Sequence, residues 1–335
     1  MKIMKKSLSL LCSLCISVFL FADGLTATLQ QGEQMTPFYG VDAFNEAYQA
    51  ADSGAVITLS VGSFNSSITP IEKSLTIIGA SAMQSDNQYN TNLNNITIVA
   101  DNVTIEGVKF SNLVNLGNIK NCHIKRSYLT CLRSLNDSSF HTNTIVEQSY
   151  VNREVAIKTG INYCIQNSYL GGFYTMNTVN NMAYITNCYI YNFFGGNGYQ
   201  PWAIYKKNYL CHGCSGRIAT NSIVYVQSPS EFYDNVIYYY YYYYSSSVGS
   251  FTYRLGAYSG TIYINNIEIQ ASTTSASKIP KITTQLASDS TYIGPAGGMG
   301  VSDYPAIPRI VSKSIDSNTD SEGKLNISIT VKAEK

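Results

Sequence analysis

A repeat of about 20 residues is the feature of this sequence that most constrains its fold. A tyrosine between a polar and an aliphatic residue recurs in steps of 22, 19, 20 and 20 residues, at Tyr128, Tyr150, Tyr169, Tyr189 and Tyr209. Short alternating segments rich in Val, Ile, Thr and Tyr surround each copy, and this pattern predicts β-strands. A unit this small cannot bury its own apolar face. We therefore expect an all-β fold in which the copies stack about 4.8 Å apart as the coils of a right-handed parallel β-helix.

The residues between the strands are consistent with this architecture. Asparagines crowd the junctions, where their side chains tolerate left-handed backbone angles and can form ladders from coil to coil. Helical periodicity occurs in one stretch, at about residues 41–52, which predicts a short helix that caps the first coil. Its expected apolar face comprises Ala43, Phe44, Ala47, Ala50 and Ala51.

The N-terminus has the layout of a secretory signal peptide, predicted over residues 1–22. Three lysines precede an apolar run from Leu8 to Phe21, and Ala22 supplies a small residue for cleavage. The alternative is an uncleaved anchor, although the run is short for a membrane span, which needs about 20 residues. No second apolar run is long enough to cross a bilayer, so we expect an exported product without a transmembrane span.

Charge and cysteine content narrow the classes of partner. The formal net charge is +1 and 13% of residues are charged, which gives no electrostatic case for binding nucleic acid. Beyond the signal segment, Cys211-His212-Gly213-Cys214 resembles half a zinc site, but a structural site needs four ligands. We expect a local disulfide or free thiols rather than a metal, with pairing left open among Cys122, Cys131, Cys164, Cys188, Cys211 and Cys214.

Residues 38–110 resemble the start of bacterial pectin-lyase-like β-helix proteins. The resemblance rests on the segments FNEAYQAA, GAVITLSVGSF and KSLTIIGA and extends over about residues 38–270. It implies a β-helix domain over residues 23–270. Residues 271–335 resemble the exit segment and C-terminal β-hairpin tail of secreted β-helix proteins from Gram-negative bacteria, which implies secretion or an outer-surface location. Ile310 to Ile315 and Leu325 to Val331 are the expected hairpin strands.

Enzymatic activity is the sharper of two functional hypotheses. The acids are too scattered for a glycosidase, which needs two clustered carboxylates. The best candidate for a polysaccharide lyase is the group Arg153, Glu154 and Lys158, which is similar in texture to alginate and chondroitin lyases. Calcium would be its cofactor. The expected base one coil earlier is missing, because that stretch offers His141 and no lysine. The simpler interpretation is a solvated charged turn.

Tyrosine content is the other functional signal, with 28 tyrosines and a run of seven. Tyrosines exposed along a solenoid would form columns able to receive a sugar or a protein; alternatively, they fill the core or stack between coils. We expect the run to project in part from the coil, as an extended strand or a protruding loop that forms an exposed apolar patch, with self-association as the rival explanation. Its members are Tyr238, Tyr239, Tyr240, Tyr241, Tyr242, Tyr243 and Tyr244.

The function these features favour is that of an exported or surface β-helix protein which binds a glycan or a protein partner without catalysis. No metal and no other cofactor is expected for that role. A polysaccharide lyase is the alternative. The β-helix fold alone does not decide between them, because the same fold supports many activities.

Overall fold

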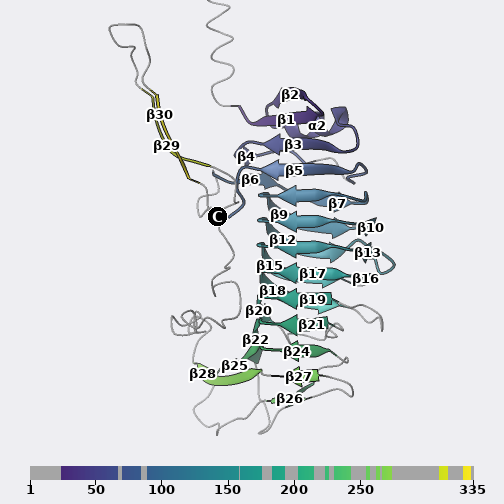
Figure 1. Cartoon of the computed structure of the whole chain (residues 1–335), viewed down its shortest axis with the longest axis vertical. Helices are drawn as coiled ribbons and strands as arrows, with labels where there is room; N and C mark the ends of the chain where they lie inside the picture. Colours follow the sequence, from purple (N-terminus) through teal and green to yellow (C-terminus); the bar gives the residue numbers. More distant parts are fainter. Residues whose placement is uncertain are drawn as a thin grey trace, which may run out of the picture.

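The chain forms a parallel β-solenoid, seen as stacked strands in Figure 1. The computed structural model describes residues 24–66, 70–83, 89–157, 159–175, 183–192, 203–214, 223–225, 230–242, 254–256, 262–264, 266–273, 309–315 and 327–332. The predicted signal peptide and Lys158 lie outside these residues.

Three sheets form the faces of the solenoid. Sheet A consists, in spatial order, of β2(Gln34–Tyr39), β1(Thr26–Gln31), β3(Ala55–Leu59), β5(Leu75–Gly79), β8(Thr104–Glu106), β11(His123–Lys125), β14(Ile145–Glu147), β17(Tyr163–Gln166), β19(Ala183–Thr186), β21(Ala203–Lys206), β24(Glu231–Tyr233) and β27(Ile262–Ile264). Sheet B consists of β28(Ile267–Thr273), β25(Val236–Tyr242), β22(Tyr209–Cys214), β20(Tyr189–Asn192), β18(Tyr169–Thr175), β15(Tyr150–Ile157), β12(Tyr128–Ser134), β9(Lys109–Leu116), β6(Thr91–Leu93) and β4(Gly62–Ser63), with β7(Ile96–Ile98) paired to β9. The short sheet C comprises β10(Ile119–Lys120), β13(Phe140–Thr142) and β16(Thr159–Ile161).

Two further strand pairs lie outside these three sheets. β23(Ile223–Tyr225) pairs in parallel with β26(Arg254–Gly256). β29(Arg309–Ile315) pairs antiparallel with β30(Ile327–Lys332), in the part of the chain where the sequence predicts the terminal hairpin.

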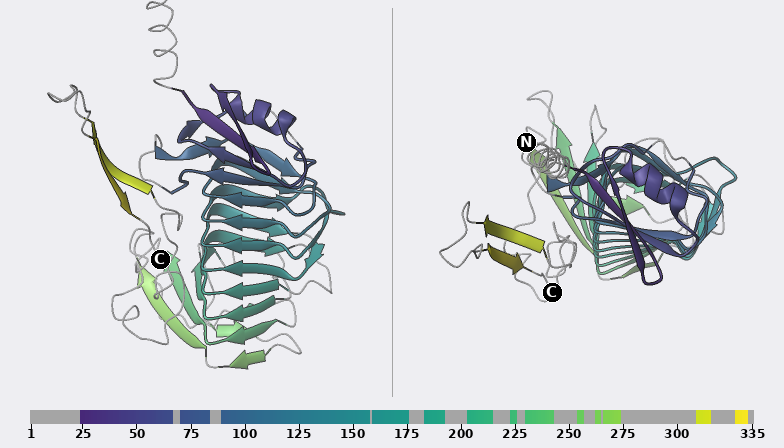
Figure 2. Two further views of the ribbon diagram at one scale, coloured as in Figure 1. Left: turned by 45° about the horizontal axis from the view of Figure 1, so that its top comes forward. Right: turned by 90° about the horizontal axis from the view of Figure 1, so that it is seen from above.

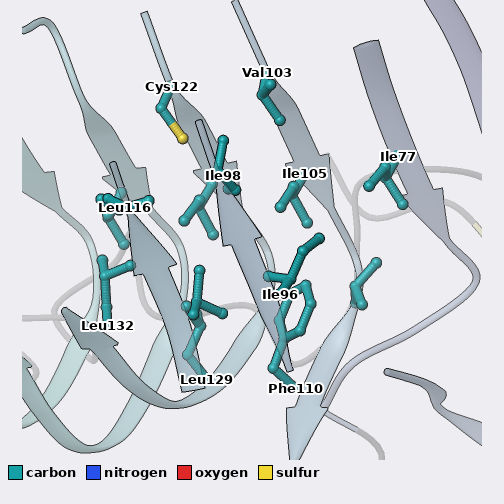
Figure 3. Close-up of a cluster of buried hydrophobic side chains, with 14 of the residues drawn as sticks. Ile77, Ile96, Ile98, Val103, Ile105, Phe110, Leu116, Cys122, Leu129 and Leu132 are labelled. Atoms are coloured by element: carbon teal, nitrogen blue, oxygen red, sulfur yellow. The ribbon is translucent and has the colours of Figure 1, made fainter. Parts of the chain in front are cut away.

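The interior is filled by the inward half of each alternating strand. In sheet A the position held by Ile105 in β8 is held by Ile124 in β11 and by Val146 in β14, and all three are fully buried. Figure 3 shows how such side chains from neighbouring coils gather inside the solenoid. Further along the same column, Tyr205 and Phe232 stack with ring centroids 4.8 Å apart. The period-two pattern therefore encodes one continuous core.

Asparagines stabilise the corner that precedes sheet A. Asn102, Asn121, Asn143 and Asn162 all have positive φ, between 54° and 57°. From Asn121 onward, each side-chain amide donates to the oxygen of the asparagine one coil earlier: Asn121 Nδ2 to Asn102 Oδ1 at 2.8 Å, and Asn143 and Asn162 likewise at 3.1 Å. This confirms the predicted asparagine ladder and explains why the corners tolerate left-handed angles.

The helix α2(Ala43–Ala50) lies at the N-terminal end of the solenoid, as Figure 2 shows, within the predicted residues 41–52. Ala43, Phe44 and Ala47 are buried in the core as expected, whereas Ala50 is exposed and Tyr48 is buried instead. The Lys73 ammonium caps the C-terminal end of the helix, where it donates to the carbonyls of Tyr48, Gln49 and Ala51 at 2.7 to 3.1 Å. A cation at this point satisfies carbonyls that have no partner within the helix.

The tyrosine run does not leave the solenoid as a loop, at least over its first five members. Their strand β25 pairs in parallel with β22 on one side and with β28 on the other. The 20-residue step is not continued beyond Tyr209, because the chain between coils is longer there and Tyr209 is in register with Val236. Tyr243 and Tyr244 lie outside the described residues, as do the side chains of Tyr238 to Tyr242. The exposed patch therefore stays a prediction.

Candidate functional site

The repeated tyrosine forms a ladder on the outer face of sheet B. Tyr128, Tyr150, Tyr169 and Tyr189 each begin a strand and lie in register from coil to coil. Their rings are parallel to within 8°, with successive centroid distances of 5.2, 4.3 and 5.1 Å. We call these four residues the tyrosine ladder.

The repeat motif itself explains why the ring points outward. The polar residue before each tyrosine is buried at a corner: Ser149 Oγ accepts from the amide of Ser127, and Ser168 Oγ accepts from the amide of Ser149. The aliphatic residue after each tyrosine is buried in the core. Because side chains alternate along a strand, the tyrosine between them is directed to the surface.

The ladder presents ring edges rather than ring faces. Neighbouring rings cover the faces that they turn toward one another, so both faces of Tyr150 and Tyr169 are covered, while the four side chains remain partly exposed. The Lys109 ammonium lies 4.9 Å from the centroid of the Tyr128 ring and covers the first face. Burial, and then the neighbouring Tyr150, raise the pKa of Tyr128, so this phenol stays neutral and keeps its proton for donation. The stacking expected between coils is thus confirmed, together with partial exposure.

The charged lyase candidates lie on the same strand as a rung of the ladder. After Tyr150, β15 bulges outward at Asn152 and Arg153, and both side chains are exposed. The Glu154 carboxylate forms an ion pair with Arg133 of β12. The strand one coil before Arg153 and Glu154 is therefore β12, and its basic residue is Arg133. The segment with His141 pairs with β16 instead.

A second polar cluster, which the sequence did not reveal, lies on sheet A. The Lys125 ammonium is 2.8 Å from Glu106 Oε2, and Arg126 binds the other oxygen of the same carboxylate. Burial raises the pKa of Glu106, but Lys125 and Arg126 outweigh that effect and lower it overall. One coil on, Glu147 binds His123 and Gln166, each at 2.8 Å. The signal that could have found this cluster is the shared position of Glu106, Lys125, Glu147 and Gln166, each of which is the last residue of a sheet A strand.

The described cysteines are free thiols. Cys122 and Cys188 are fully buried, and burial raises the pKa of each to about 12, so neither is a reactive thiolate. The side chains of Cys211, His212 and Cys214 lie outside the described residues. Within the described part, no group of three or more histidine, cysteine or acidic side chains is arranged to hold a metal ion. No described helix is long and apolar enough to span a membrane.

Comparison with known proteins adds no relative: no family model, no curated protein and no solved structure matches this chain. The functional argument therefore rests on the geometry of the faces described above.

Proposed function

We propose that the protein is exported and that it binds a glycan or a surface protein, without catalysis, through the outer face of sheet B. The observation that carries this proposal is the tyrosine ladder, a row of four stacked and partly exposed tyrosines at the spacing of the coils. Tyrosine combines an apolar body with a hydrogen-bonding tip, which suits it to recognition surfaces. The N-terminal leader pattern supports an extracellular or outer-surface location.

The stacking of the rings determines which parts of the tyrosine ladder a partner can contact. Because the ring faces are covered, an internal rung cannot stack on a sugar ring. The partner instead meets the edges and hydroxyl groups, which repeat along the solenoid axis. Exposed polar side chains of the bulge, Asn152 and Arg153, lie beside the ladder and extend the contact. A ligand with a repeating row of hydroxyl groups, such as a polysaccharide, matches this arrangement.

Binding to a panel of polysaccharides and a glycan array tests the proposal. We expect the wild-type protein to bind at least one glycan, and the double variant Tyr150→Phe, Tyr169→Phe to bind it roughly ten- to thirtyfold more weakly, because two hydrogen bonds are lost. The matched control is Tyr184→Phe, an exposed tyrosine on sheet A that is not part of the ladder. Absence of any binding contradicts the function. Equal binding by all variants contradicts the assignment to the ladder.

The same protein, incubated with uronate polysaccharides, separates binding from lyase activity. Elimination creates an unsaturated uronate that absorbs ultraviolet light, and we expect a flat trace across the panel. The reason is that Glu154 forms an ion pair with Arg133. Arg153 therefore has no free carboxylate beside it on its own strand with which to form the catalytic pair of a lyase. A rising absorbance that disappears in Arg153→Ala would establish the lyase instead.

A further inference from the structure

His141 is a buried titratable group that the proposed binding face does not use. It lies in the middle strand of sheet C with 1% of its surface exposed, between Ile119 of β10 and Gly160 of β16 in the parallel register. Its Nε2 is 2.9 Å from the hydroxyl oxygen of Ser134, the last residue of β12. The imidazole also lies near the backbone of Gly117, although its Nδ1 makes no hydrogen bond of ordinary geometry within the described residues. The imidazole is thus enclosed in the core in its neutral form.

Among the described residues, the elements packed against His141 place no charge beside it that could balance a proton. Lys120 on β10 is exposed and in register with Thr142, and Arg133 on β12 points outward to Glu154. The loop before β13 carries the exposed Asp137, and β16 has no charged residue. The one buried carboxylate of the described chain is Glu106, which is bound by Lys125 and Arg126 on sheet A. An imidazolium at position 141 would therefore be an uncompensated buried cation.

Sheet C is also the least extensive face of the solenoid. Its strands have two or three residues, compared with up to eight in sheet B. The loop from Leu135 to Ser139 is held by the Leu135 amide, which donates to the Leu116 carbonyl, and by bonds within the loop around Asn136. Phe140 follows, with its amide bound to Asn118 Oδ1 at 2.8 Å. Segments with so few backbone contacts open at a lower free energy than the long strands.

We propose that His141 is a proton-operated latch: in mild acid, β13 and the loop before it detach from the solenoid while sheets A and B stay folded. The opened segment would carry Leu135 and Phe140, two apolar side chains that are each already 45% exposed. Opening allows the imidazole to take up a proton in water, which the closed core opposes.

The size of the effect follows from the linkage between protonation and opening. Burial lowers the pKa of His141 to about 4 in the closed form, although the backbone of Gly117 acts in the opposite direction. In the open segment the pKa is about 6.5. The closed form is thus fully stable above pH about 6.5 and loses stability as the pH falls toward about 4. At pH 5 the opening equilibrium should rise roughly thirtyfold over its value at neutral pH.

Hydrogen exchange of the full chain at pH 7.5 and pH 5, corrected for the intrinsic pH dependence of exchange, tests the latch. We expect residues 135–142 of the wild-type protein to lose protection by roughly thirtyfold at pH 5, while the core strands of sheet A keep theirs. His141→Gln, which retains a polar contact to Ser134 but cannot be protonated, should show no such loss. His141→Leu is the second variant in case the first does not fold. His123→Gln, altering a half-exposed histidine paired with Glu147, should behave as wild type.

Two results would overturn the latch. Unchanged protection of residues 135–142 in the wild-type protein at pH 5 excludes acid opening, and this result needs no variant. An equal loss of protection in the His141 variants shows that another group is responsible. Neither result bears on glycan binding by the tyrosine ladder, which lies on sheet B.

Discussion

Replacing Asn208 with leucine is expected to lower the free energy of unfolding by about 3–4 kcal/mol, because a fully buried amide joins three coils at this point. Asn208 Oδ1 accepts from the amide of Cys188 at 2.9 Å. Its Nδ2 donates to the Ile185 carbonyl at 2.7 Å and to Asn235 Oδ1 at 3.0 Å. Leucine has a similar volume but leaves the Cys188 amide buried without its acceptor, and each such orphaned group costs about 1–3 kcal/mol.

The measurement is denaturation by urea, followed by circular dichroism. A matched control is Asn143→Gly, which removes a rung of the exposed asparagine ladder while keeping the backbone angle that glycine also adopts. We expect the control to lose less than about 1 kcal/mol. If the two variants lose the same free energy of unfolding, the buried hydrogen bonds of Asn208 stabilise the fold no more than the exposed ones of Asn143, and the argument from burial is wrong.

Replacing Gly171 with alanine should destabilise the solenoid by about 2–3 kcal/mol through overpacking. The β15 bulge at Asn152 and Arg153 arches over this glycine, so that an added methyl group would lie 2.0 Å from the Asn152 carbonyl oxygen and 2.8 Å from that of Arg153. Both obstacles are backbone atoms, which cannot move without disturbing the register between β15 and β18.

Thermal unfolding of Gly171→Ala should show a midpoint several degrees below wild type. Gly24→Ala is the control, because nothing lies within 4 Å of a methyl group there. An unchanged midpoint for Gly171→Ala would mean that the bulge relaxes freely. In that case the exposed position of Arg153 is not fixed by the fold.

The repeat predicted the solenoid because the sequence signals that specify a coil lie within that coil. Alternation determines which side of a strand is buried, and asparagine marks corners with positive φ; both are visible in any single coil. The same period predicted a tyrosine column but left open whether its rings are exposed, fill the core or stack between coils. The helix was found from its alanines, but Tyr48 replaced Ala50 on the buried side because the short helix also meets Glu72, whose amide donates to the Tyr48 hydroxyl at 2.9 Å.

Contacts that depend on register across coils were harder to predict. Arg133 pairs with Glu154 only because the β15 bulge shifts the register between the two strands. No residue in either strand indicates this bulge in the sequence. The Glu106 and Glu147 clusters join residues about 20 positions apart whose chemistry is unremarkable in sequence. The sequence could not show why the 20-residue step stops before the tyrosine run, because a longer connection between coils looks, in sequence, like the end of the repeat.

The buried polar residues that precede the strands of sheet B bond from coil to coil as an inner ladder, and this ladder continues across the longer connection. Asn208 and Asn235 are 27 residues apart and Asn235 and Asn266 are 31 apart, yet they bond as neighbouring rungs just as Ser149 and Ser168 do across 19 residues. The bonding between neighbouring rungs is therefore the same whether 19 or 31 residues of chain separate them. A change in the length of chain between two rungs is thus compatible with the same stacking of coils, and with outer faces that stay in line.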